Sequence, residues 1–167
     1  YGATEQDFAR VKVKNSKHGI ANPKARYNKL FTEEEVLASP LVSAPLRLFE
    51  ICATSDGGAA LVITSMDYAK KKGIANPVKI SGVSTISPTF PQTVIDMPDF
   101  TTDSAAGISA PDRSFRDSIA YAAYEEAGLG PEDMDLAEVY DLSSALELDW
   151  YENIGLCKPG EAEQLLR

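Results

Sequence analysis

The sequence is poor in the residues that build metal sites and disulfide frameworks. Its 167 residues include one histidine and two cysteines, and Cys52 and Cys157 are far apart and belong to no C-x-x-C pair. This scarcity predicts no metal site and no disulfide. It favours a reducing, cytoplasmic setting in which both cysteines are buried as small apolar side chains. No apolar run approaches the roughly 18 residues that a membrane span needs.

Basic residues are also outnumbered, with 16 Lys and Arg against 25 Asp and Glu and a net charge of −9. Because a phosphate backbone selects basic surfaces, this balance argues against non-specific nucleic-acid binding. It does not exclude a phosphorylated ligand, since such a ligand needs only a local basic spot. The length and the 44% share of apolar residues fit a globular domain with a core of its own.

Helices are predicted from capping residues and from apolar spacings of three and four. They run from Thr4 to about Gly19, from Thr32 to just before Pro40, from Ser65 to Gly73, from Asp112 to Gly128, and from Ser144 to about Asn153. In the last helix, Ser144 and Glu147 have the S-x-x-E spacing of a capping box.

Three strands are predicted between these helices. They are the apolar run Gly57–Ser65, the alternating segment Val78–Ser87, and Leu136–Tyr140 after a turn. Residues 40–45 are expected to be irregular, and residues 88–112 to form a long excursion over the surface. Strands that alternate with helices indicate an α/β fold.

Tyr140 and Asp141 stand at the carboxyl end of the third predicted strand, where the chain turns into the last helix. Ligands of open α/β sheets gather at such ends, so these two residues are candidates for a site. Their spacing alone also allows a structural interpretation, in which Asp141 caps the helix and Tyr140 packs its ring.

Four stretches of the chain resemble, in the same order, the sterol-carrier-type thiolases of the thiolase superfamily. They are "VKNSKHGIANPKARY", "EEVLASPLV", "LRLFEICATSDGGAALVI" and "AGLGPEDMDLAEVYDLSSALELDWYENIGLCKPGE". The resemblance implies a thiolase fold of two similar α/β halves in an αβαβα architecture. It also implies a dimer that acts on coenzyme A thioesters without a further cofactor. Residues 1–77 would be the end of the N-terminal half with its loop excursion, and residues 78–167 the first part of the C-terminal half, both within a longer chain.

The resemblance fails at the candidate site, because the family has His or Asn where this chain has Tyr140, and Phe where it has Ser143. In the family, that His or Asn holds the thioester oxygen as negative charge develops on it. The replacement resembles the thiolase-like aldolases of bacterial steroid side-chain degradation, known as lipid-transfer-protein aldolases. A phenol can relay a proton or donate to an oxyanion, so Tyr140 is the first catalytic candidate, with Asp141 to orient or tune it.

His18 has two interpretations. A single histidine at the end of a helix is commonly a cap that satisfies the helix dipole. The resembling thiolases also have a histidine in this region, which borders their acyl pocket. The resemblance therefore assigns His18, together with Ser143, to substrate binding.

The resemblance predicts retro-aldol cleavage of a β-hydroxyacyl-CoA, of steroid side-chain origin, to a ketone and a shorter acyl-CoA. Two alternatives stay open: a 3-oxoacyl-CoA thiolase or acyltransferase of the sterol-carrier type, and a non-catalytic scaffold that binds acyl-CoA. The family's nucleophilic cysteine lies upstream of this chain and its G-H-P motif downstream, so the sequence does not choose between the first two. The aldolase branch also implies a small companion protein with an OB-fold and a zinc ribbon.

Overall fold

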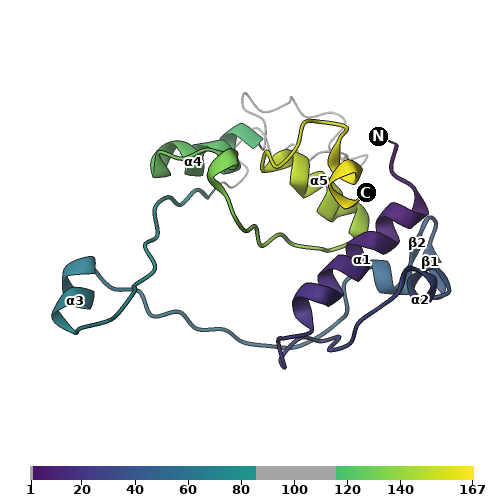
Figure 1. The fold of residues 1–167 in the computed structure, drawn as a ribbon, viewed down its shortest axis with the longest axis horizontal. Coiled ribbons are helices and arrows are strands. Elements are labelled where there is room, and N and C mark those ends of the chain that lie inside the picture. The colour runs from purple at the N-terminus through teal and green to yellow at the C-terminus, as the bar shows by residue number, and fades with distance from the viewer. Residues whose placement is uncertain (1, 86–115) are drawn as a thin grey trace, which may run out of the picture.

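Helices dominate the regular structure of residues 2–85 and 116–167, the part of the chain that the computed structural model describes (Figure 1). The α-helices are α1 (Glu5–Gly19), α2 (Glu33–Leu37), α3 (Met66–Lys71), α4 (Ala122–Ala127) and α5 (Ser144–Asn153). Shorter elements are the 3-10 turns η1 (Leu48–Glu50), η4 (Pro131–Asp133) and η5 (Ala162–Leu166), and the π-helical segment η3 (Arg116–Tyr121) that leads into α4. A hairpin of β1 (Leu41–Ser43) and β2 (Leu46–Arg47) separates α2 from η1.

The predicted helix starts are confirmed where a capping hydroxyl is present. Thr4 and Thr32 each open a capping box, in which the hydroxyl accepts from a backbone N–H three residues on, and the acid there accepts from the Thr N–H. The Ser65 hydroxyl accepts from the backbone N–H of Tyr68 and opens α3. The predicted end at Gly128 is confirmed by its left-handed φ of 69°, whereas the predicted start at Asp112 lies outside the described residues.

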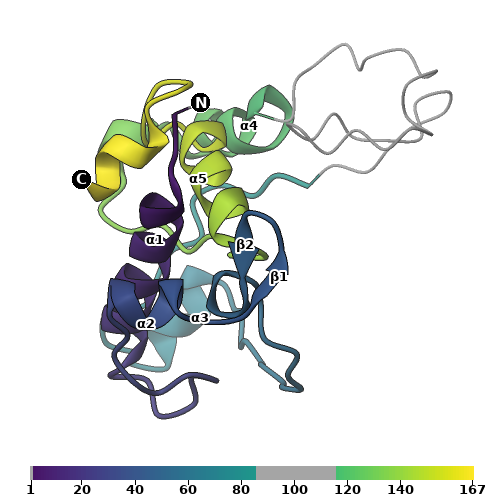
Figure 2. The same cartoon turned by 90° about the vertical axis from the view of Figure 1, so that its right-hand side faces the viewer.

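Helix α1 supplies one side of both apolar clusters in the described residues. Its Val11 packs with α5 and η5, and its Ala9 packs with α2 and the loop before it (Figures 1 and 2). The first cluster consists of Val11, Leu148, Tyr151 and Ala162, and the second of Ala9, Phe31 and Val36. Residues 2–51 and 142–167, which contribute these clusters, are called the helical lobe below.

A buried ion network ties the start of α1 to Arg167. The Asp7 carboxylate is fully buried and accepts hydrogen bonds from Arg167 Nη2 at 2.7 Å and from Arg10 Nη1 at 3.1 Å. It also accepts from the backbone N–H of Thr4 at 2.8 Å. A buried carboxylate with several partners contributes to stability only while its partners are present.

Residues 52–85 leave the helical lobe as a long excursion that carries α3, and this segment is called the arm (Figures 1 and 2). The predicted strand Gly57–Ser65 is wrong, because the structure has no strand there and leaves Leu61, Val62 and Ile63 between 71 and 97% exposed. Residues 78–85 of the predicted strand Val78–Ser87 also form no strand, and residues 86–87 lie outside the described part. A strand needs a neighbour for its backbone groups, and no described strand runs beside the arm.

Two further predictions about extended chain need correction. The segment Leu136–Tyr140 runs extended but joins no ladder, and only the isolated bridge between Ile51 and Ser143 follows it. Residues 40–45 were expected to be irregular, yet they contribute β1 and the hairpin turn. Pro40 precedes the first strand and Pro45 lies in the turn, where a missing backbone N–H removes no ladder hydrogen bond.

The predicted excursion at residues 88–112 lies outside the described residues. In the part of the chain that the structure does describe, no helix is both long enough and apolar enough to cross a bilayer.

Candidate functional site

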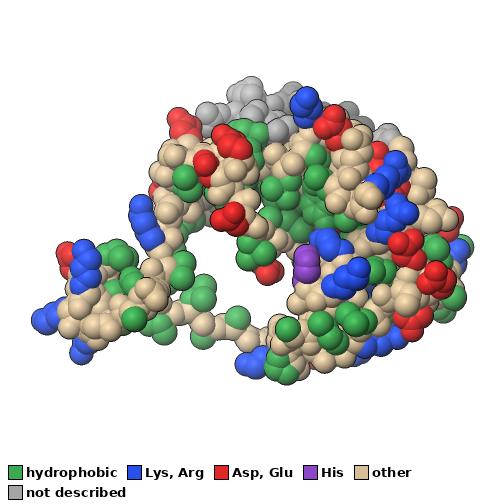
Figure 3. Space-filling model, viewed as in Figure 1, with side chains coloured by type: hydrophobic (Ala, Val, Ile, Leu, Met, Phe, Trp, Pro, Cys, Tyr) green, Lys and Arg blue, Asp and Glu red, His purple; other side chains and the backbone are tan. Residues whose placement is uncertain are grey.

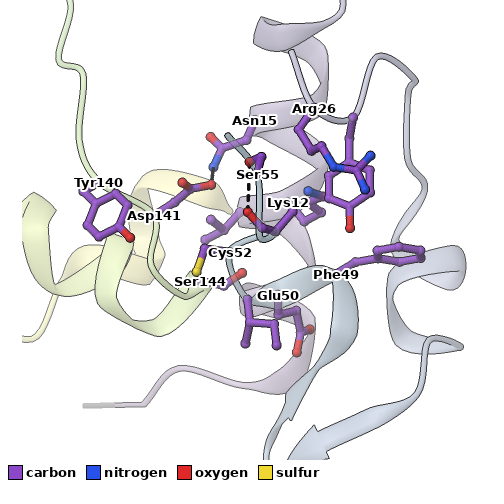
Figure 4. A pocket seen from close by; sticks show the side chains of 14 residues that line it. Lys12, Asn15, Arg26, Phe49, Glu50, Cys52, Ser55, Tyr140, Asp141 and Ser144 are labelled. Carbon is purple, nitrogen blue, oxygen red and sulfur yellow. Dashed lines mark hydrogen bonds between the residues drawn. The ribbon is translucent and has the colours of Figure 1, made fainter. Parts of the chain in front are cut away.

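A cavity of about 410 Å³ opens where α1, the loop after it, η1 and the chain before α5 meet (Figure 4). Helix α1 contributes Lys12 and Asn15 to its wall, and the loop after α1 contributes Arg26. Tyr140 and Asp141 line it as well. The two first-choice candidates from the sequence are therefore brought to one cavity with side chains that precede them by more than 100 positions.

Tyr140 and Asp141 lie together at one end of this cavity (Figure 4). Tyr140 is 61% exposed, so a ligand in the cavity can reach this residue. An antiparallel bridge between Ile51 and Ser143 tethers the chain beside it, and its hydrogen bond runs from the N–H of Cys52 to the carbonyl of Leu142 at 2.9 Å. Tyr140 and Asp141 thus lie at the end of a segment, residues 136–140, that joins no sheet and is followed by this bridge.

The Asp141 carboxylate accepts a hydrogen bond from Asn15 Nδ2 at 3.2 Å (Figure 4). Burial raises the pKa of Asp141 above its usual value, and the negative charge of Glu147 raises it further. The positive charge of Lys12 and the bond from Asn15 act in the opposite direction. Asp141 therefore takes up a proton more readily than an ordinary surface carboxylate does.

The other end of the cavity combines cations with aromatic rings (Figure 4). The Lys12 ammonium lies 4.2 Å from the centroid of the Tyr27 ring, and Arg26 Cζ lies 5.4 Å from the same centroid. Burial lowers the pKa of Lys12, and the charge of Asp141 partly offsets this effect. A cationic and aromatic wall of this kind suits an anionic group on a ligand.

The resemblance assigned Ser143 and His18 to substrate binding, and the structure places Ser143 at the start of α5 and His18 in the last turn of α1. Ser143 does not line the cavity and is the N-cap of α5, where its hydroxyl accepts from the backbone N–H of Leu146 at 3.2 Å. The predicted capping box of Ser144 and Glu147 is wrong, since Ser144 is already helical and lines the cavity while Glu147 is buried beneath it. A hydroxyl one residue earlier reaches the free N–H groups of the first turn.

His18 is exposed in the last turn of α1 and does not line the cavity (Figure 3, purple). This position matches the cap interpretation of a histidine at a helix end. Its assignment to substrate binding stays a prediction.

The two cysteines are free, as the absence of a disulfide framework requires. The expectation that both are buried is wrong, because Cys52 is exposed on the cavity wall and Cys157 is half-buried. Cys52 follows η1 at the start of the arm, where no packed strand covers it.

Sequence reasoning missed Lys12, Asn15 and Cys52 as wall residues of the cavity. One signal was present for Asn15, which continues the helical spacing of Phe8 and Val11 and is therefore a polar residue on the inner face of α1. Among the described residues, no three His, Cys, Asp or Glu side chains gather where they could hold a metal ion.

The family comparison matches the C-terminal part of the chain. Residues 91–167 match the model of the "Thiolase C-terminal domain-like" family. Over nearly the whole chain, the solved structure "Ltp2-ChsH2(DUF35) aldolase" has a TM-score of 0.74 and 30% identity, covering 99% of this chain and 41% of that one.

Three curated relatives align over 99% of this chain. "Benzoylsuccinyl-CoA thiolase subunit BbsB" of Thauera aromatica is 35% identical over 166 residues, or 40% of its length. "Steroid side-chain-cleaving aldolase" of Thermomonospora curvata is 32% identical over 167 residues, also 40% of its length. "Sterol carrier protein 2" of Rattus norvegicus is 31% identical over 166 residues, or 29% of its length.

These matches identify the chain as thiolase-like in sequence and in fold, which confirms the resemblance and the predicted fold class. Within that class, its relatives are the sterol-carrier-type thiolases and the thiolase-like aldolases. The chain spans 29 to 40% of the length of the three curated relatives.

Proposed function

We propose that the protein containing this chain is an aldolase of the thiolase superfamily that cleaves a β-hydroxyacyl-CoA, derived from a steroid side chain, by a retro-aldol reaction. The supporting observation is the position of Tyr140, whose exposed side chain lines a cavity beside Asp141. The resembling thiolases have His or Asn at that position. A phenol there keeps a hydrogen-bond donor for the thioester oxygen and adds a group that can pass on a proton.

The proposed reaction balances without a thiol nucleophile or a redox step. A base removes the proton of the β-hydroxyl group, the β-carbon becomes a ketone as the Cα–Cβ bond breaks, and the electron pair passes to the thioester enolate. A proton returned to the α-carbon completes the shorter acyl-CoA. Tyr140 would stabilise the enolate oxygen or relay a proton, and Asp141, whose raised pKa favours proton uptake, would exchange a proton with it.

The cationic end of the cavity fits the same substrate class. Coenzyme A carries several phosphate charges, and Lys12 and Arg26 place two positive charges on the wall away from Tyr140. Aromatic contacts from Tyr27 hold both cations in position. We therefore propose that the thioester lies toward Tyr140 and the anionic part of the coenzyme toward Lys12.

The names of the relatives also support a multi-subunit aldolase. One curated relative is named as a steroid side-chain-cleaving aldolase, another is named as a subunit, and the similar solved structure is named as an Ltp2-ChsH2 aldolase. By analogy we propose a homodimer that works with a small companion protein. The division at residue 77 between two thiolase halves belongs to the same proposal.

A second candidate is a 3-oxoacyl-CoA thiolase or acyltransferase. It is favoured by the relative named as a benzoylsuccinyl-CoA thiolase subunit. Such an enzyme would transfer the acyl group through a cysteine and would consume free coenzyme A.

Product analysis separates the two candidates. The whole protein would be incubated with a β-hydroxyacyl-CoA in the absence of free coenzyme A, and ketone and shorter thioester would be quantified. The proposal expects the two products in equal amounts. Turnover of a 3-oxoacyl-CoA only when coenzyme A is added, with no ketone from the hydroxy substrate, would contradict it in favour of the thiolase.

A further inference from the structure

A buried carboxylate lies directly behind the candidate site. Glu147 is 1% exposed, and its Oε1 accepts hydrogen bonds from Lys14 Nζ and, at 2.5 Å, from the Tyr151 hydroxyl. The Lys14 ammonium also donates to the Tyr151 oxygen at 2.7 Å. A buried carboxylate needs such partners to be stable. Helix α1 supplies Lys14 and helix α5 supplies Tyr151.

One amide connects this buried group to the cavity. Asn15 Nδ2 donates to Glu147 Oε2 at 2.5 Å and to Asp141 Oδ2 at 3.2 Å. The same nitrogen thus bridges two carboxylates that are six positions apart in sequence: Glu147 inside the lobe, and Asp141 on the cavity wall, whose bond to Asn15 is drawn in Figure 4. The hydrogen bond from Asn15 therefore ties the Asp141 carboxylate to α1.

We infer that Asn15 and Glu147 are positioning residues, which hold the Asp141 carboxylate in the cavity and set its charge. Only the expected effect of Asp141 on kcat rests on the proposed function. The arrangement itself is defined by the hydrogen bonds of Asn15 to Glu147 and Asp141. A bond from Asn15 to Glu147 would be enough to link α1 to α5, and the second bond, to Asp141 on the cavity wall, is not needed for that link.

The groups that face Asp141 act on it with opposite signs. From α1, the charge of Lys12 and the bond from Asn15 lower its pKa, and from α5 the charge of Glu147 raises it. Burial and the bond to Glu147 raise the pKa of Tyr151, so its hydroxyl stays protonated and keeps donating. The net direction for Asp141 is upward, with burial as the largest cause.

Two further side chains lie beside Asp141 in the cavity. Tyr140 precedes it in the chain, and Cys52 lines the same cavity. Lys14 lies on the far side of Glu147, where its ammonium balances the buried charge.

Two substitutions in the whole protein test the inference because they predict opposite shifts. Glu147→Gln removes a negative charge and should lower the pKa of Asp141, whereas Asn15→Leu removes a donor and should raise it. The carbon-13 resonance of the Asp141 carboxyl carbon, assigned by its loss in Asp141→Asn, reports the titration directly. The acidic limb of the pH profile of kcat should move in the same direction in each variant. Asn15→Leu should also lower kcat by about a hundredfold, since a displaced catalytic group has an effect of that order.

Two controls keep the test specific. Glu152 is another buried acid of α5, but its Oε1 accepts from the backbone N–H of Gly160 at 2.8 Å. Glu152→Gln should therefore leave the pKa of Asp141 unchanged. Asn15→Gln retains an amide donor, so its shift in the pKa of Asp141 should be smaller than that of Asn15→Leu. If Glu147→Gln does not fold, this pair of Asn15 variants decides the question alone.

Shifts of the same sign in both variants, or no shift in either, would overturn the inference and leave a purely structural link. If the Asp141 resonance shifts as expected while the wild-type protein releases no ketone from a β-hydroxyacyl-CoA, the positioning of Asp141 holds and the proposed function fails. The spectroscopic and the kinetic outcome are therefore read separately.

Discussion

The helical lobe and the arm differ in how their apolar residues are used. In the lobe, α1 buries Ala9 and Val11 against partners that are more than 20 positions away. In the arm, the apolar run around Val62 is almost fully exposed, and hydrophobic side chains lie along the extended chain beside α3 (Figure 3). Both regions contain apolar residues, but in the described chain the lobe buries them in clusters, whereas the arm buries only Ala69 of α3.

The difference shows which structures a piece of chain can form from its own residues. Helices satisfy their backbone groups internally and need only a cap and one apolar stripe. Strands depend on a second strand and stay extended without one. The candidate site lies at the boundary of the two regions, since α1 supplies one wall and the extended chains at Cys52 and Tyr140 supply the other.

The largest expected effect is the loss of the buried ion network in the lobe. Asp7→Ala removes the carboxylate that Arg167 and Arg10 share, and because both arginines remain partly exposed to water it should lower the free energy of unfolding by about 1.5–3 kcal/mol. Urea denaturation of the 167-residue chain measures this change. The exposed pair of Lys29 and Glu35 provides the control, and Lys29→Ala should cost less than about 1 kcal/mol. Equal effects of the two substitutions would contradict the distinction between buried and exposed pairs.

Acid should weaken the lobe through the same carboxylate. The hydrogen bond from Arg167 lowers the pKa of Asp7 well below its usual value of 3.8, although burial opposes this effect. The folded state therefore binds a proton at Asp7 less readily than the unfolded state. The stabilisation is complete above the usual pKa and is lost as the pH falls below it. The urea midpoint should drop more between pH 6 and pH 3 in the wild type than in Asp7→Asn, and parallel curves would contradict this assignment.

A smaller effect is expected from the N-cap of α5. Ser143→Ala removes the hydroxyl that accepts from Leu146 N–H and should destabilise the chain by about 1 kcal/mol. Ser144→Ala should have less effect, because Ser144 is within the helix and does not provide the capping bond. Thermal melting compares the stability of the two variants. A larger loss of stability for Ser144→Ala than for Ser143→Ala would favour Ser144 as the N-cap, as the sequence predicts.

The smallest effect is expected in the arm. Val62 is 97% exposed, so Val62→Ser in the 167-residue chain should change the free energy of unfolding by less than about 0.5 kcal/mol. The same substitution in the whole protein is expected to cost more if further strands pair with the arm. A loss above 1 kcal/mol in the short chain would mean that the arm already packs against the lobe.

The sequence predicted those features whose cause is local. Thr4, Thr32 and Ser65 start helices through bonds that span three residues, and Gly128 ends one through its own φ. The predicted strands are absent because no described strand lies beside them to accept their backbone hydrogen bonds. The S-x-x-E pattern predicts Ser144 as the cap, but the pattern alone does not fix which of two adjacent serines is already helical.

The site was predictable only in part for the same reason. Tyr140 and Asp141 could be found because they interrupt an apolar segment and depart from a recognisable family pattern. The contacts of Asn15 with Asp141 and Glu147 join positions 126 and 132 apart, and no periodicity in the sequence reports them.

The proton-handling role of Tyr140 is tested most directly by the rate at which Tyr140→Phe releases ketone from a β-hydroxyacyl-CoA. The substitution removes one oxygen from an exposed ring, so folding should be preserved while the rate falls by about 10²–10⁴-fold. Tyr68→Phe, at a tyrosine of α3 that is 51% exposed and does not line the cavity, should keep the wild-type rate. A Tyr140→Phe protein that releases ketone as fast as the wild type would contradict the account.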